Sequence, residues 1–81
     1  MSIDFHALLA RIRAGDWAGA HAIVQTDEGS PPAYWLHGIL HLQEGDLGNA
    51  GYWYARARRD FASRGSIDEE LARFEAELPR H

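Results

Sequence analysis

Apolar residues recur every three to four positions in five segments of the chain, and no segment alternates between apolar and polar positions as a surface strand does. This spacing places the apolar side chains along one face of a helix, where a neighbouring helix can cover them. The sequence therefore predicts an all-α fold of five helices packed as antiparallel hairpins. The residues expected on the buried faces are Phe5, Leu8, Leu9 and Ile12; Trp17, Ala20, Ile23 and Val24; Leu47, Ala50, Tyr54, Ala57 and Phe61; and Ile67, Leu71, Phe74 and Leu78.

Residues that start and stop helices divide these segments. Gly15 and Gly45 each end a helix, because glycine adopts positive φ without strain, and the aspartate that follows each of them caps the next helix. Ser2 is the expected cap of the first helix, and Ser66 begins a capping box for the last. The predicted organisation is one domain over residues 1–81, with a first hairpin at 3–26, a second hairpin at 31–60 and a C-terminal helix at 66–78.

The two turns belong to a repeated pattern, since residues 15–20 (Gly-Asp-Trp-Ala-Gly-Ala) are similar to residues 45–50 (Gly-Asp-Leu-Gly-Asn-Ala), 30 positions later. This pattern resembles the tetratricopeptide repeat (TPR), whose unit is a pair of antiparallel helices. The second hairpin carries the resemblance at Tyr34 or Trp35, Gly38, Gly45, Ala50, Tyr54 and Ala57, whereas the first has Leu8 where the family has a small residue. The segment from His37 to Tyr54 is also similar to small bacterial proteins with no assigned activity.

The TPR resemblance implies an interaction module and favours a non-enzymatic protein over an enzyme. Trp35, Ile39 and Leu42 occupy positions of the family's ligand-facing surface, and Trp53 extends this surface. The implied partner is a protein, a peptide or a second copy of the chain, with no cofactor. Core packing of Trp35 is an equally good interpretation. Two repeats are fewer than the roughly three that such folds need, so either the C-terminal helix completes the core or the chain pairs with another.

A metal-binding or acid–base site is the alternative function. His37, His41 and Glu44 lie at i, i+4 and i+7, which places them along one helix face, and imidazole and carboxylate both bind divalent metal ions. Asp46 and Asn49 could support them from across the turn. The structural alternative is that both histidines are hydrogen-bonded to Asn49, Tyr52 or backbone. Glu44 needs a partner in either case, because its charge opposes the helix dipole.

Composition narrows the classes of function. The chain has no cysteine, which excludes disulfides and thiolate chemistry, and a net charge of −4, which disfavours nucleic-acid binding. We expect a cytoplasmic protein with no membrane contact, since no signal peptide or membrane-spanning run is visible. Arginine supplies all eight basic side chains, which with the abundant alanine and glycine suggests a bacterial source. Four of them, Arg56, Arg58, Arg59 and Arg64, could bind a phosphate or an acidic partner. The structural alternatives are that they favour the dipole at the end of a helix and stay solvated, or that they pair with the acidic last helix.

Overall fold

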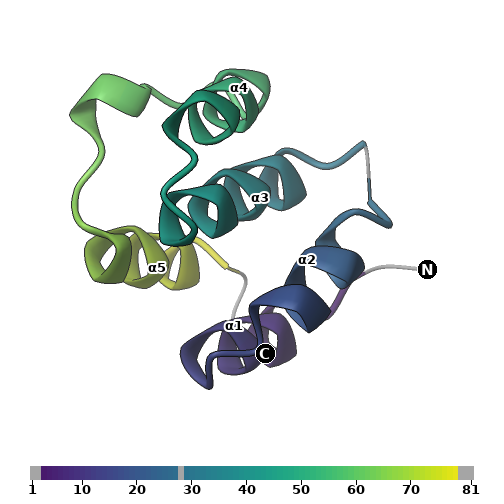
Figure 1. The fold of residues 1–81 in the computed structure, drawn as a ribbon. Helices are drawn as coiled ribbons and strands as arrows, with labels where there is room; N and C mark the ends of the chain where they lie inside the picture. The colour runs from purple at the N-terminus through teal and green to yellow at the C-terminus, as the bar shows by residue number, and fades with distance from the viewer. Residues whose placement is uncertain (1–2, 28, 79–81) are drawn as a thin grey trace.

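The computed structural model describes residues 3–27 and 29–78. Over these ranges the chain forms five α-helices and one short 3-10 helix, with no strand, which confirms the predicted all-α class (Figure 1). The elements are α1 (Phe5–Arg13), α2 (Trp17–Val24), α3 (Pro31–Gln43), α4 (Leu47–Arg56), the 3-10 helix η1 (Phe61–Ser63) and α5 (Ile67–Ala76).

Helix α3 is the centre of the molecule. It packs against α2, α4 and α5, and its contact with α4 is the most extensive (Figure 1). Gly38 makes this contact close, because a Cβ atom at that position would lie 2.6 Å from the ring of Tyr54. Because α3 has neighbours on three sides, one apolar stripe along the helix would not fill all three contacts. It buries Ala33, Trp35, Leu36, His37, Gly38, Ile39, Leu40 and His41.

Helix α5 packs against α3 and α1 and contributes Leu71 and Phe74 to the core. The ring of Phe74 meets Trp35 edge to face, with centroids 5.1 Å apart, and meets Phe5 at 5.6 Å. A buried hydrogen bond adds to this packing, because the Tyr54 hydroxyl donates to the carboxylate of Glu70 across 2.5 Å. Burial and this carboxylate raise the pKa of Tyr54. The periodicity of the sequence predicted Phe74 in the core but gave no sign of the buried Glu70.

The two Gly-Asp turns have the same geometry, as their sequence similarity predicts. Gly15 has φ of +88° and Gly45 has φ of +80°. The aspartate after each glycine accepts a hydrogen bond from a backbone N–H three residues later, which caps the following helix. The capping box of Ser66 and Glu69 is also present. These local signals fix where each hairpin turns and therefore which faces of its helices meet.

Three boundary details differ from the sequence-based expectations. Helix α4 ends at Arg56 instead of near residue 60, because Arg58 adopts a left-handed conformation with φ of +61°. Helix α1 is capped by Asp4, and the expected cap Ser2 lies outside the described residues. Leu47, expected on a buried face, is 55% exposed, and the two residues after it in the first turn of α4 are exposed as well.

Candidate metal centre

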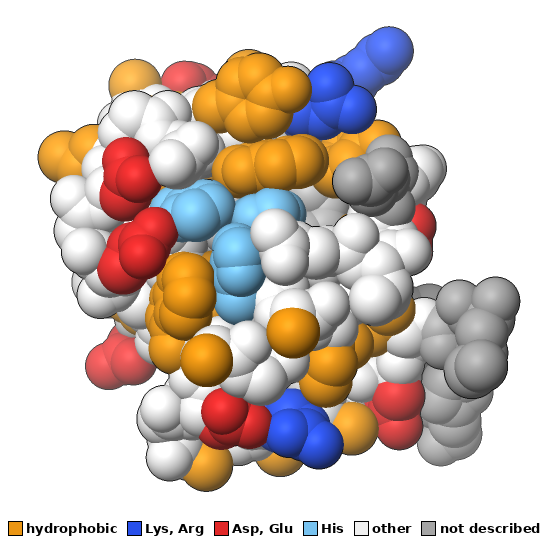
Figure 2. Space-filling model, turned by 45° about the vertical axis from the view of Figure 1, so that its right-hand side comes forward, with side chains coloured by type: hydrophobic (Ala, Val, Ile, Leu, Met, Phe, Trp, Pro, Cys, Tyr) orange, Lys and Arg blue, Asp and Glu red, His pale blue; other side chains and the backbone are white. Residues whose placement is uncertain are grey.

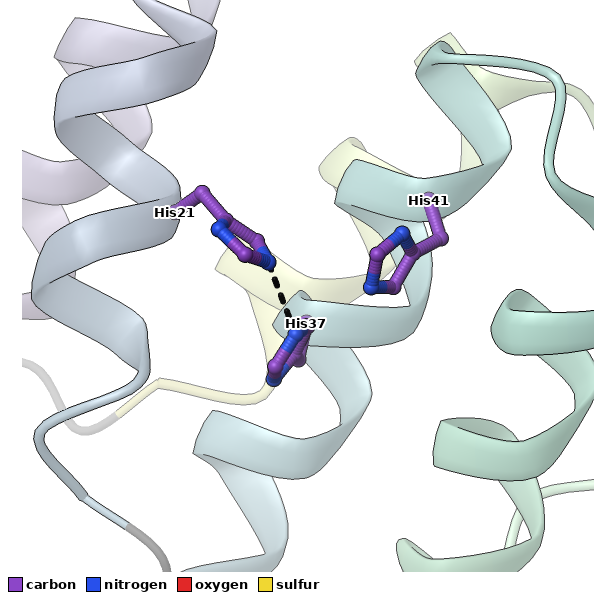
Figure 3. A group of neighbouring side chains, drawn as sticks. All are labelled: His21, His37 and His41. Atoms are coloured by element: carbon purple, nitrogen blue, oxygen red, sulfur yellow. Dashed lines mark hydrogen bonds between the residues drawn. The ribbon is translucent and has the colours of Figure 1, made fainter.

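Three imidazole rings from two helices meet beside the core. His21 comes from α2, while His37 and His41 come from successive turns of α3 (Figure 3). One nitrogen from each ring lies within 4.8 Å of the others. The Nε2 atoms of His21 and His37 are 3.0 Å apart, so one of these rings donates a hydrogen bond to the other. We refer to this group as the three-histidine cluster.

Aromatic side chains hold two of these rings in place. Trp17 stacks on His21 with centroids 4.6 Å apart, and its indole N–H donates to the carbonyl of Leu40 across 2.7 Å. On the other side of the cluster, Trp53 from α4 stacks on His37 at 4.0 Å. The packing of α2 and α4 against α3 therefore fixes the imidazole planes, so that they keep their mutual arrangement without a bound ion.

His41 is oriented by a carboxylate. Its Nδ1 atom is hydrogen-bonded to Glu44, which is the partner that the position of Glu44 near the helix C-terminus requires. A carboxylate accepts this bond, so Nδ1 is the donor and Nε2 is on the side of the ring away from Glu44. Carboxylate–histidine pairs of this kind support metal sites, because they set the tautomer and raise the basicity of the ligating nitrogen.

The cluster favours neutral imidazoles. Burial, together with the neighbouring His21 and His41, lowers the pKa of His37 to about 4. Burial and His41 also lower the pKa of His21, against a smaller opposing effect of Glu44. At neutral pH both rings are therefore uncharged, which is the form that binds a metal ion. His21 and His37 are thus uncharged before an ion arrives, and binding through Nε2 of both rings would replace the hydrogen bond between them.

The spacing of the nitrogens suits a small tetrahedral ion. Zn–N bonds of about 2.0–2.1 Å place tetrahedral ligand nitrogens about 3.3 Å apart. The observed 3.0 Å between Nε2 of His21 and Nε2 of His37 is near this value, and the three ring nitrogens all lie within 4.8 Å of one another. His21 is half-buried, and His37 and His41 keep 6% and 8% of their surface exposed. Figure 2 shows histidine side chains at the surface between hydrophobic and acidic ones, which would give an ion a route from solvent.

The predicted set of His37, His41 and Glu44 is thus present in altered form. Both histidines belong to the cluster, but Glu44 supports His41 instead of facing the other two rings. Glu44 also lies near Asp46 in a second group with His41. Asp46 itself is occupied as a helix cap and by the side-chain amide of Asn49, whose hydrogen bonds lower its pKa.

Sequence reasoning missed His21, which supplies the third ring. Its signal was its position four residues after Trp17, which places both side chains on one helix face. Predicting the contact with His37 also required the packing of α2 on α3, and periodicity alone does not give the rotation of two helices about their axes.

The predicted interaction surface is largely inside the protein. Trp35 is 3% exposed and Ile39 is fully buried, so these two residues line no surface groove. The reason is that α5 covers the side of α3 that a TPR array would leave concave. Leu42 and Trp53 are half-buried and remain accessible in part.

The clustered arginines are largely engaged within the chain. Arg59 pairs with Glu77 after α5, with NH1 3.0 Å from Oε2, and its guanidinium lies 3.7 Å from the centroid of the Trp35 ring. Arg56 lies over the ring of Tyr34, and Arg64 over that of Phe61. Pairing with the acidic C-terminal segment is thus observed for Arg59.

Comparisons of the chain with family models, curated proteins and solved structures give no match. Within the described residues, none of the helices combines the length and the apolar character that crossing a bilayer requires.

Proposed function

We propose that this protein binds a divalent transition-metal ion through His21, His37 and His41. The observation that carries the proposal is the convergence of three ring nitrogens, held by two helices, within 4.8 Å of one another. The bond from His41 to Glu44 supports it further, because it leaves the lone pair of Nε2 available.

The donor set favours particular ions. Neutral imidazole suits Zn²⁺, Cu²⁺, Ni²⁺ and Co²⁺, whereas Mg²⁺ and Ca²⁺ prefer oxygen ligands. The chain has no cysteine to supply thiolate for softer ions. We therefore expect binding of Zn²⁺ and Ni²⁺ in preference to Mg²⁺.

Calorimetric titration of the metal-free protein with Zn²⁺ tests the proposal. We expect one ion per chain, and a gain of about 2.7 kcal/mol in unfolding free energy when free Zn²⁺ reaches 100 times its Kd. His21→Ala is expected to weaken binding by more than about 100-fold, since loss of a ligand costs more than loss of an outer-shell group.

His6→Ala is the matched control, because His6 is exposed on α1 and belongs to no ligand group found in the described residues. Circular dichroism of each metal-free variant shows whether its helices are retained. A wild-type titration with no saturable heat, or equal affinity in His21→Ala, would refute the proposal.

A contact surface for a protein, peptide or second copy is the second candidate function, and we place it on the outer face of α4. Leu47 and Tyr52 are 55% and 53% exposed, which is unusual for large apolar side chains. Leu42 and Trp53 of the predicted surface are partly accessible beside them. Sedimentation velocity over a range of concentrations tests self-association. We expect Leu47→Glu to abolish any dimer. A wild-type monomer at every concentration would contradict a contact surface for a second copy of the chain.

We also propose that the two hairpins are copies of one TPR-like unit. The matching turn geometry at Gly15 and Gly45 supports this relationship. We also propose a bacterial source and a cytoplasmic location, which the composition suggests.

A further inference from the structure

We infer that an ion bound by the three-histidine cluster keeps an open coordination position, and that water bound there attacks a small carbonyl substrate such as an ester. This inference rests on the proposed metal site and concerns what the site does once it is loaded. Three features carry it: the number of converging ligands, their charge, and the pocket beside His37.

The first feature is that the ligand set is incomplete for a closed site. Among the described residues, no fourth histidine or carboxylate joins the group formed by His21, His37 and His41. Glu44, the nearest candidate, is bound to the opposite nitrogen of His41. Structural zinc sites have four protein ligands, whereas catalytic sites have three and leave the fourth position to water. The cluster therefore has the ligand number of a catalytic site.

The second feature is the charge of the ligands. Three neutral imidazoles leave the full 2+ charge of the ion to act on its bound water. Three neutral ligands around zinc can lower the pKa of that water to about 7, so that a hydroxide is present at neutral pH. The indole rings of Trp17 and Trp53, stacked on two of the ligands, limit competing solvation on those sides.

The third feature is a small pocket that adjoins the cluster. Its wall is formed by Val24, Gln25, Asp27, His37 and Trp53. His37 belongs to both the pocket and the ligand set, so a molecule in the pocket lies beside the coordination sphere. The side chains of Val24 and Trp53 offer an apolar contact, while Gln25 and Asp27 offer polar groups. This lining suits a small, partly apolar substrate.

The proposed reaction needs no reagent other than water and the ester. Bound water releases one proton to buffer, and the resulting hydroxide oxygen forms a bond to the carbonyl carbon of the ester. The carbon–oxygen bond to the alcohol portion then breaks, and the departing oxygen takes a proton from solvent. The carboxylic acid formed would then release its proton to buffer, so that the products would be a carboxylate and an alcohol with net release of one proton, and a new water molecule would refill the open position.

Two measurements on the full chain test the inference, and the first does not depend on turnover. The protein loaded with Co²⁺ should show a visible spectrum that changes in a single ionisation between about pH 6 and 9, as expected for bound water. Azide, a small anion, should alter that spectrum by displacing the water. A spectrum insensitive to both pH and azide would show a closed coordination sphere and would overturn the inference.

The second measurement is hydrolysis of 4-nitrophenyl acetate by the protein loaded with Zn²⁺. We expect a rate at least about tenfold above equimolar free Zn²⁺, with a pH profile that follows the Co²⁺ ionisation. Activity should disappear with a chelator and in His41→Ala, and it should persist in His6→Ala.

The outcomes separate the two proposals. Failure to bind Zn²⁺ or Co²⁺ at all refutes the metal site itself. Tight binding with no ionisation and no hydrolysis above free Zn²⁺ overturns only the present inference and leaves a metal-binding protein.

Discussion

Glu44 occupies a position where a negative charge is unfavourable, at the C-terminal end of α3. Its hydrogen bond to Nδ1 of His41 gives it a role there, since the same contact offsets the charge and directs the ring. The sequence identified Glu44 as a residue in need of a partner. What the sequence did not indicate is that Glu44 contacts His41 from the side opposite the other two rings, where the proposed site gives it a supporting role and not that of a ligand.

Replacing Glu44 by glutamine tests this positioning role. We expect Glu44→Gln to weaken Zn²⁺ binding by about 10- to 100-fold, the usual effect of losing an outer-shell partner. The reason is that an amide accepts the Nδ1–H bond less strongly and no longer increases the basicity of Nε2. Calorimetric titration measures the change.

Glu75→Gln is a suitable control for the loss of one negative charge. Glu75 is on α5 and pairs with Arg13, away from the three-histidine cluster. An equal loss of affinity in both variants would indicate a general electrostatic effect and contradict the positioning role.

Local sequence signals predicted the turns and the helix caps, but they did not predict where α4 ends. The glycine turns, the aspartate caps and the capping box of Ser66 all act within a few residues, so the sequence predicts them directly. Helix α4 ended early because Arg58, not a glycine, takes the left-handed position of its C-terminal cap. Sequence reasoning looks for glycine there, and the strain at Arg58 is held in place by contacts that are distant in sequence, such as that of Arg59 with Glu77.

Arg58→Gly is expected to stabilise the protein by about 1 kcal/mol, because it removes the steric cost of a side chain at positive φ. The Arg58 side chain is exposed, so little packing is lost with it. Urea denaturation measures the change as a higher midpoint with an unchanged slope.

Ala55→Gly, at an exposed position within the same helix, provides the contrast. There glycine should destabilise by about 1 kcal/mol, since φ is already helical and only backbone entropy changes. A lower midpoint for both variants would mean that Arg58 contributes more through its contacts than its conformation costs.

At the scale of the whole molecule, the arrangement of α3 between three helices determines both what was predictable and what was not. The all-α class and most core positions follow from periodicity. The placement of α5 over Trp35 and the meeting of His21 with His37 depend on how helices rotate and cross, which a single sequence does not encode locally. The first of these arrangements buries Trp35 of the predicted interaction surface, and the second brings His21 to the candidate metal centre.

The buried cluster should also make the metal-free protein sensitive to mild acid. His37 binds a proton at about pH 4 when folded and near its ordinary pKa of 6.5 when unfolded. Between these values the unfolded state binds more protons, so stability falls as the pH falls. One such group contributes at most about 1.4 kcal/mol per pH unit, and the lowered pKa of His21 acts in the same direction.

Urea midpoints at pH 7, 6 and 5 in the presence of a chelator measure this effect. The range stops at pH 5 because the pKa values of the Asp46, Glu69 and Glu77 carboxyl groups are lowered, so their stabilising effect is lost only in stronger acid. We expect the midpoint to decrease steadily in the wild type and to change much less in His37→Gln, whose side chain carries no titratable group. A wild-type midpoint that stays constant from pH 7 to 5 would mean that the imidazoles accept protons without opening the cluster. In that case metal affinity should be lost in acid by simple competition for the nitrogens, with no accompanying loss of fold.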